Sequence, residues 1–162
     1  MTPPQGSIQL LDTDVAQYLL QSTNLAHVSY IATDGAPRVF PMLFHWTGQE
    51  LVLATFAGAK KIESIRTRPA IAVTIDEAST PPKVLLLRGR AAVTDVDGIV
   101  PEYRAMHHRY AGAEQGERNV AQIDRPGVGM ARISLRPQWV AVLDFETRFP
   151  GETSATEFER RG

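Results

Sequence analysis

Short runs of β-branched and aromatic residues, each closed by a turn signal, are the feature that most constrains the fold of this chain. Residues 26–33 read AHVSYIAT and end at Asp34-Gly35, a dipeptide that favours a tight hairpin. Residues 38–46 return as RVFPMLFHW, and after Thr47-Gly48 the segment 50–56 continues as ELVLATF. Strands separated by such short turns predict an antiparallel sheet, because parallel strands need longer crossover connections.

Four later segments carry the same strand pattern, at residues 70–76, 83–95, 128–135 and 139–146. Gly89 lies in the middle of the second of these segments, where it indicates a bulge or a bend. Pro41 lies inside the earlier segment 38–46 and has no N–H to donate, so that strand is expected at a sheet edge or bulged.

Isolated helices interrupt these strands. Helical spacing of apolar residues follows Asp12 and Thr13, either of which is a suitable N-cap. A short helix is expected over residues 59–67, with Ile62 and Ile65 facing inward.

A longer helix is expected over residues 97–110, with Asp97 as its cap, Pro101 in its first turn and Gly112 at its end. The polar segment 113–127 is expected to be a loop. The whole pattern favours a mainly β fold, a β-barrel with a few covering helices.

Size and composition exclude several classes of protein. The chain has 162 residues, which predicts one domain over residues 1–150 and a flexible polar tail over 151–162. A formal net charge of -1 argues against a dedicated nucleic-acid binder, and the absence of cysteine excludes thiolate sites and disulfides. The sequence shows neither a signal-peptide pattern nor a membrane-length apolar run, so a cytoplasmic setting is expected.

Basic side chains gather in the stretch FAGAKKIESIRTRP, residues 56–69, although the chain is nearly neutral. Lys60 and Lys61 lie at the expected helix start, where free N–H groups and the helix dipole favour an anion such as phosphate. Arg38, on the hairpin, could donate to the same anion. The alternative is that these bases form an ordinary solvated helix face.

The order of these elements resembles a known superfamily. Three segments occur in the order and spacing of the FMN-binding split-barrel proteins. They are the hairpin with its DGAPRVFP turn, the helix start AKKIESI followed by RPAIAVTI, and the strand LRGRAAV. That superfamily includes the pyridoxamine 5'-phosphate oxidase-like proteins and the flavin- and deazaflavin-dependent oxidoreductases. The resemblance extends from Asp14 to Asp144 and implies a split β-barrel of antiparallel strands with covering helices, assembled as a homodimer with flavin sites between the subunits.

The resemblance also implies which residues bind FMN. Arg38, Lys60 and Lys61 match positions that hold the cofactor phosphate. The ring and ribityl chain would lie along two strand segments and a tryptophan supplied by the partner subunit, which correspond to Pro41, Met42, Leu43, Ala54, Thr55, Phe56 and Trp139. Ala59 replaces a serine that is common before the basic pair, and no Arg-x-His pair follows the last strand, so strict vitamin oxidase activity is not expected.

The resulting hypothesis is a flavin-dependent oxidoreductase acting on a small molecule, with no protein group predicted to be catalytic and no metal site. A deazaflavin (coenzyme F-420)-dependent reductase is the first alternative, because Arg66 and Arg68 could accompany a longer anionic tail. A second alternative, from another class, is a non-enzymatic flavin or haem carrier, with His27, His45 or His107 as the haem ligand.

Overall fold

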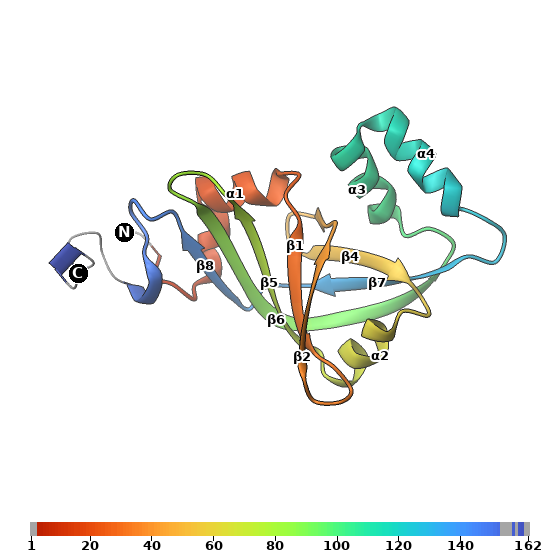
Figure 1. Cartoon of the computed structure of the whole chain (residues 1–162), viewed down its shortest axis with the longest axis horizontal. Coiled ribbons are helices and arrows are strands. Elements are labelled where there is room, and N and C mark those ends of the chain that lie inside the picture. The colour runs from red at the N-terminus through yellow and green to blue at the C-terminus, as the bar shows by residue number, and fades with distance from the viewer. Residues whose placement is uncertain (1–2, 153–156, 158, 161–162) are drawn as a thin grey trace.

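The computed structural model describes residues 3–152, 157 and 159–160. Within them the chain forms eight strands and four α-helices (Figure 1). The strands are β1 (Ala26–Ile31), β2 (Pro37–Met42), β3 (His45–Trp46), β4 (Leu51–Phe56), β5 (Ala70–Glu77), β6 (Lys83–Asp97), β7 (Gly129–Leu135) and β8 (Trp139–Leu143). The helices are α1 (Asp14–Gln21), α2 (Lys60–Thr67), α3 (Pro101–Ala111) and α4 (Ala113–Ile123), with the 3-10 turns η1 (Ile8–Asp12) and η2 (Pro150–Glu152).

All strand pairs are antiparallel, in the order β2-β1-β5-β6-β7-β4-β3, and β8 pairs with β6 outside this path. The long strand β6 joins two halves, because it pairs with β5 as far as Arg90 and with β7 from Ala91 onward. This mainly β, split-barrel architecture is the one that the sequence predicts.

Gly89 lies at the point where β6 passes from one half to the other. A Cβ atom there would lie 2.8 Å from Leu135 Cδ1 and 3.0 Å from the Arg136 carbonyl oxygen. Only glycine therefore lets these segments approach so closely, which confirms the bend expected from the sequence.

The strand expected over residues 38–46 is two strands. Pro41 lies in β2, which is at the edge of the sheet as expected. After β2 the chain turns inward at Phe44, which is fully buried. The Phe44 carbonyl accepts a hydrogen bond from Arg109 Nη2, on α3, at 2.5 Å. This carbonyl is therefore bonded to a helix side chain, whereas in a continuous strand it would be an acceptor for a neighbouring strand.

The first two helices follow the sequence prediction. Thr13 caps α1 by accepting a hydrogen bond from the Ala16 N–H at 3.4 Å. In α2, Ile62 and Ile65 are 4% and 1% exposed and face the core. The prediction that Asp97 caps the third helix is wrong, because Asp97 still belongs to β6, where it pairs with Gly129, and α3 begins only at Pro101.

The prediction of a loop over residues 113–127 is also wrong, since residues 113–123 form α4. Its apolar stripe is narrow: Val120 is buried, and Gly116 lies against α3. A Cβ atom on Gly116 would lie 2.6 Å from the His107 carbonyl oxygen. Glycine disfavours a helix interior, yet Gly116 is the residue whose missing side chain lets α3 and α4 pack closely.

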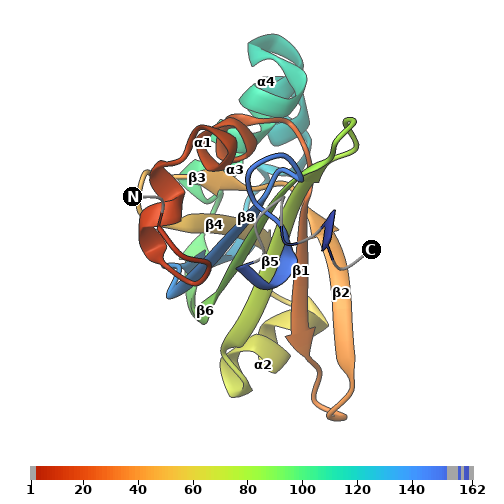
Figure 2. The same cartoon turned by 90° about the vertical axis from the view of Figure 1, so that its left-hand side faces the viewer.

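The helices cover different parts of the sheet (Figure 2). Helix α1 lies on β5 and β6, α2 lies beside β1 and β6, and α3 contacts β3 and β4. No helix among the described residues is both long enough and apolar enough to cross a membrane. Most of the tail predicted over 151–162 lies outside the described residues.

Candidate functional site

A cavity of about 280 Å³ lies between β2, β4 and α3, and is called the apolar cavity here. Seven of the ten predicted cofactor-binding residues line it. These are Pro41, Met42, Leu43, Ala54, Thr55, Phe56 and Lys61. Its other lining residues are Phe40, Tyr103, Met106, His107 and Met130.

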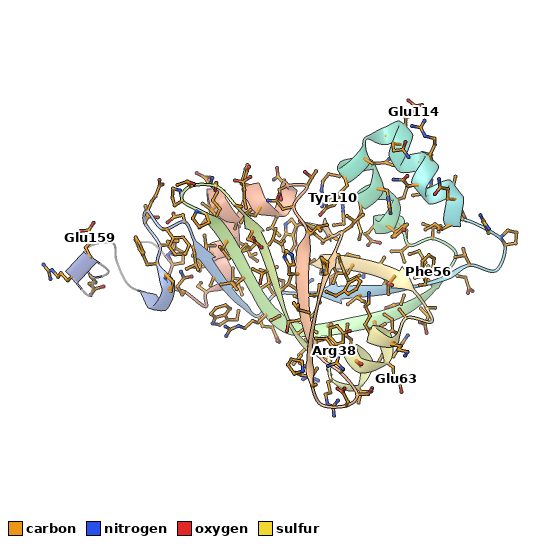
Figure 3. The ribbon with its side chains drawn as sticks, viewed as in Figure 1. Arg38, Phe56, Glu63, Tyr110, Glu114 and Glu159 are labelled. Atoms are coloured by element: carbon orange, nitrogen blue, oxygen red, sulfur yellow. The ribbon has the colours of Figure 1, made fainter. Side chains whose placement is uncertain are left out.

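The floor of the apolar cavity is buried and its rim is exposed. Met106 and Met130 are each 1% exposed and belong to the core cluster beneath α3. Phe40 and Phe56, at 48% and 50% exposed, are large apolar side chains left open to solvent. Figure 3 shows Phe56 near the end of β4. A flat apolar group could therefore contact both the buried floor and the aromatic rim.

A second cavity, of about 510 Å³, lies between the β1–β2 hairpin and the start of α2, and is called the basic cavity here. Arg38, Lys60 and Lys61 line it together with two acids, Asp34 and Glu63. In Figure 3 Arg38 lies on the hairpin beside α2. Lys61 lines both cavities, so they are neighbours on the surface.

The start of α2 has backbone donors without a side-chain cap. Its N-cap residue, Ala59, makes no side-chain capping bond, because alanine has no side-chain oxygen. The first N–H groups of a helix carry a partial positive charge. The Ile62 N–H donates to the Ala59 carbonyl at 3.0 Å, so the N–H groups of Lys60 and Lys61 are the ones left for a ligand.

Lys61 is the most constrained cation of this corner. Its Nζ lies 3.9 Å from the centre of the Phe40 ring, and burial lowers the pKa of Lys61. Partial desolvation makes an anionic partner more favourable here than at an open surface. Arg38 is already paired with Asp34 at 2.7 Å, and would have to share that partner or exchange it for a ligand.

The two other bases of the stretch have partners elsewhere. Arg66 pairs with Asp95 at 2.5 Å, and Arg68 donates to the Ala32 carbonyl. Neither lines the apolar or the basic cavity. Of the bases that the sequence predicts to gather here, only Arg38, Lys60 and Lys61 line the basic cavity.

Trp139 is the one predicted site residue that lies apart from both cavities. It begins β8, pairs with Arg88 of β6, and stacks beneath the Arg88 guanidinium at 3.8 Å. The resemblance places this tryptophan in the partner subunit's site, so its role stays a prediction.

The predicted flavin-binding residues do not include Phe40, Tyr103, Met106, His107 or Met130, and His107 is predicted only as a haem ligand. The apolar spacing of Tyr103 and Met106 on their helix was the available signal. The rings of Tyr103 and His107 lie 4.5 Å apart in the cavity wall. Burial and the neighbouring His108 lower the pKa of His107.

The other candidate histidines lie elsewhere. His27 contacts Asp76 at 3.5 Å on the outer strands, and burial is the main cause that lowers the pKa of His45, on β3. Over residues 3–152, 157 and 159–160, no group of three His, Cys, Asp or Glu side chains is placed to hold a metal ion.

The chain is similar to known proteins in sequence and in fold. The family model described as pyridoxamine 5'-phosphate oxidase matches residues 12–141. The comparison with curated protein sequences found no match.

Several solved structures share the fold. An F420 reductase is 24% identical with a TM-score of 0.61, over 77% of this chain and 94% of that one. A FAD-binding protein from Mesorhizobium loti is 18% identical with a TM-score of 0.52, over 78% and 87%. A heme binding protein from Mycobacterium smegmatis is 19% identical with a TM-score of 0.58, over 91% and 59%.

Proposed function

Because the chain belongs to the pyridoxamine 5'-phosphate oxidase family, we propose that it is a flavin-dependent oxidoreductase that binds FMN non-covalently and acts on a small molecule. The observation that carries this proposal is the position of Lys61 between the apolar and the basic cavity. A ligand with a flat apolar ring and a phosphate tail suits two such neighbouring cavities.

The residues present fit FMN. Pro41–Leu43 and Ala54–Phe56 would flank the ring, while Lys60, Lys61 and the start of α2 would hold the phosphate. Bound flavin supplies the hydride chemistry, and the protein contributes orientation and electrostatics. A dedicated acid or base is therefore not required, in keeping with a site walled mainly by apolar groups.

A homodimer is part of the proposal. Val39, Phe40 and Phe56 are 67%, 48% and 50% exposed, and they lie on β2 and at the end of β4, beside the apolar cavity. Exposed apolar groups clustered on an edge strand are typical of an interface. A second copy covering them would bury the cofactor ring and could bring its own Trp139 to it.

Deazaflavin F-420 is the second candidate cofactor, and the similarity to an F420 reductase supports it. Its longer tail carries additional negative charges. Arg66 and Arg68 are engaged, and Glu63 and Asp95 line the adjoining surface hollow of about 640 Å³ with Lys60 and Arg66. These acids oppose a polyanionic tail, so the geometry favours the single phosphate of FMN.

A carrier function is the alternative from another class. The similarity to a heme binding protein supports haem as its ligand, and His107 is the one candidate histidine that lines the apolar cavity. Haem binding predicts a Soret band that His107→Leu abolishes. A flavin carrier predicts FMN that is held but shows no turnover with nicotinamide donors and quinone or enone acceptors.

Titration of the purified apoprotein with FMN and with F-420 tests the proposal. We expect FMN fluorescence to be quenched at one equivalent per chain, and F-420 to bind more weakly. Tight binding of F-420 with no binding of FMN would replace the first candidate by the second. Arg66→Ala provides a control, because Arg66 is not expected to touch the FMN phosphate.

A further inference from the structure

His107 lines the apolar cavity from α3, and a chain of hydrogen bonds on α4 determines which of its two ring nitrogens carries the proton. The chain begins at Arg118, whose guanidinium can only donate. Arg118 donates to Gln115 Oε1 from Nη2 at 2.7 Å and from Nε at 3.2 Å. This fixes the orientation of the Gln115 amide, so its Nε2 is the donor toward Asn119.

The next two contacts determine which atom of the Asn119 amide faces His107. Gln115 Nε2 donates to Asn119 Oδ1 at 2.8 Å, which leaves the Asn119 amide nitrogen facing His107. Asn119 Nδ2 lies 3.5 Å from His107 Nδ1. Because an amide N–H can only donate, Nδ1 must be the acceptor, and in the neutral ring the proton lies on Nε2.

The state of the ring agrees with this tautomer. Burial and His108 lower the pKa of His107, which favours the neutral imidazole at physiological pH. Asn119 contacts Nδ1, and no hydrogen bond from the described part of the chain reaches Nε2. The side chain of His108 is directed elsewhere, since its Nε2 contacts Glu117 Oε2 at 2.9 Å outside the cavity.

We propose that His107 Nε2–H is a hydrogen-bond donor to an uncharged, carbonyl-bearing ligand that binds at the α3 wall of the apolar cavity, and that it determines the substrate class of the site. This inference rests on the proposed function, in which the cofactor ring lies against β2 and β4 and the lysines hold its phosphate. A neutral donor among Met106, Met130 and Leu43 suits a carbonyl oxygen better than a carboxylate, which would lose more hydration than one neutral donor restores. The Tyr103 ring packs against the same imidazole at an interplanar angle of 57°, which limits its rotation.

The tautomer can be measured without cofactor or substrate. Long-range proton–nitrogen spectra of the apoprotein, with His107 assigned by its loss in His107→Phe, are expected to show a protonated Nε2 and a bare Nδ1. Asn119→Asp places an acceptor opposite Nδ1, so the proton should move to Nδ1. A wild-type ring protonated on Nδ1 would overturn the inference.

Ligand preference is measured with cyclohex-2-en-1-one and with cyclohexene, the same ring without the oxygen. Binding is followed through the methyl signals of Met106 and Met130, in the FMN-loaded protein and in the apoprotein. We expect His107→Phe to lower the affinity for the ketone roughly fivefold and to leave cyclohexene unchanged, as the loss of one hydrogen bond implies. His107→Gln, which keeps an N–H donor, should restore much of the preference.

His108→Phe is the matched control, because it changes the neighbouring histidine outside the cavity and should leave both affinities unchanged. A ketone preference that survives in His107→Phe would overturn the inference. Flavin absorbance of the loaded protein is read before any ketone is added, so a failure to hold FMN counts against the proposed function alone. The apoprotein arm then still decides the role of His107.

Discussion

At the scale of single residues, the account depends on where one lysine lies. Lys61 follows Lys60 directly in the sequence, yet the two have different surroundings: Lys60 is exposed, while Lys61 is half-buried over the Phe40 ring. Lys61 also lines both cavities. A sequence of two adjacent lysines cannot distinguish these roles, because the difference comes from the hairpin strand that carries Phe40.

Lys61→Gln is expected to weaken FMN binding by at least tenfold, because a charge-assisted bond to phosphate in a half-buried position is lost. Fluorescence titration measures the effect. Lys83→Gln removes the same charge beside Glu77, at the opposite end of the sheet, and should leave FMN affinity unchanged. Equal affinities for the two variants would place the phosphate elsewhere.

Asp144 is expected to contribute to stability against acid. Burial raises the pKa of this carboxyl, but hydrogen bonds from the Thr147 hydroxyl and from the N–H groups of Glu146, Arg148 and Thr147 outweigh burial and lower the pKa to about 2. Because the folded pKa lies below the ordinary value of 3.8, the stabilisation is present above about pH 4 and is lost as pH falls toward 2.

Asp144→Asn should therefore lower the free energy of unfolding by about 2 kcal/mol at neutral pH, and by much less near pH 2. Urea unfolding across this pH range measures the difference. Asp12→Asn, at an exposed position, is the control and should change little. A deficit for Asp144→Asn that stays constant with pH would contradict the assignment.

At the scale of elements, the sequence predicts strands better than it predicts the helical hairpin. Alternation and the Asp34-Gly35 turn identify β1 and β2, and Gly89 identifies the bend of β6, because each depends on neighbours in sequence. Helix α4 depends on a contact with α3 through Gly116 that no local pattern contains. The site shows the same difference. Its residues on β2 and β4 could be predicted from the family pattern, whereas Tyr103 and His107 reach the cavity only because α3 packs against the sheet.

Gly116→Ala is expected to destabilise the protein by about 2 kcal/mol, because the new Cβ would lie 2.6 Å from the His107 carbonyl oxygen and 2.7 Å from the His108 nitrogen. Both neighbours are backbone atoms, so the two helices must separate. Thermal unfolding measures the loss. Gly58→Ala, whose Cβ would meet nothing within 4 Å, is the matched control. If both variants unfolded at the same temperature, the close helix contact would be refuted.

At the scale of the whole molecule, the described chain leaves one half of the proposed site open. The exposed apolar side chains of β2 and β4 border the apolar cavity, whereas Trp139 lies on β8, apart from it. One copy cannot bring these together without refolding. The proposed homodimer would cover the exposed side chains and bring the partner's tryptophan to the cavity with a single interface.

Val39→Glu introduces a charge at the most exposed apolar position of the β2 edge, which is 67% exposed. We expect it to convert dimer to monomer in sedimentation velocity, because burying the charge without a partner is costly. Ile8→Glu, at 55% exposed on η1, adds the same charge away from β2 and should leave the dimer intact. A wild-type protein that sediments as a monomer would contradict the assembly.

The central claim is that the site holds a ring through the apolar cavity and its phosphate through Lys61 and the start of α2. Comparison of FMN with riboflavin, the same ring and ribityl chain without phosphate, tests this most directly. The account predicts that wild-type protein binds FMN at least tenfold more tightly than riboflavin, and that Lys61→Gln reduces this ratio. Equal affinity of the wild-type protein for FMN and riboflavin would contradict it.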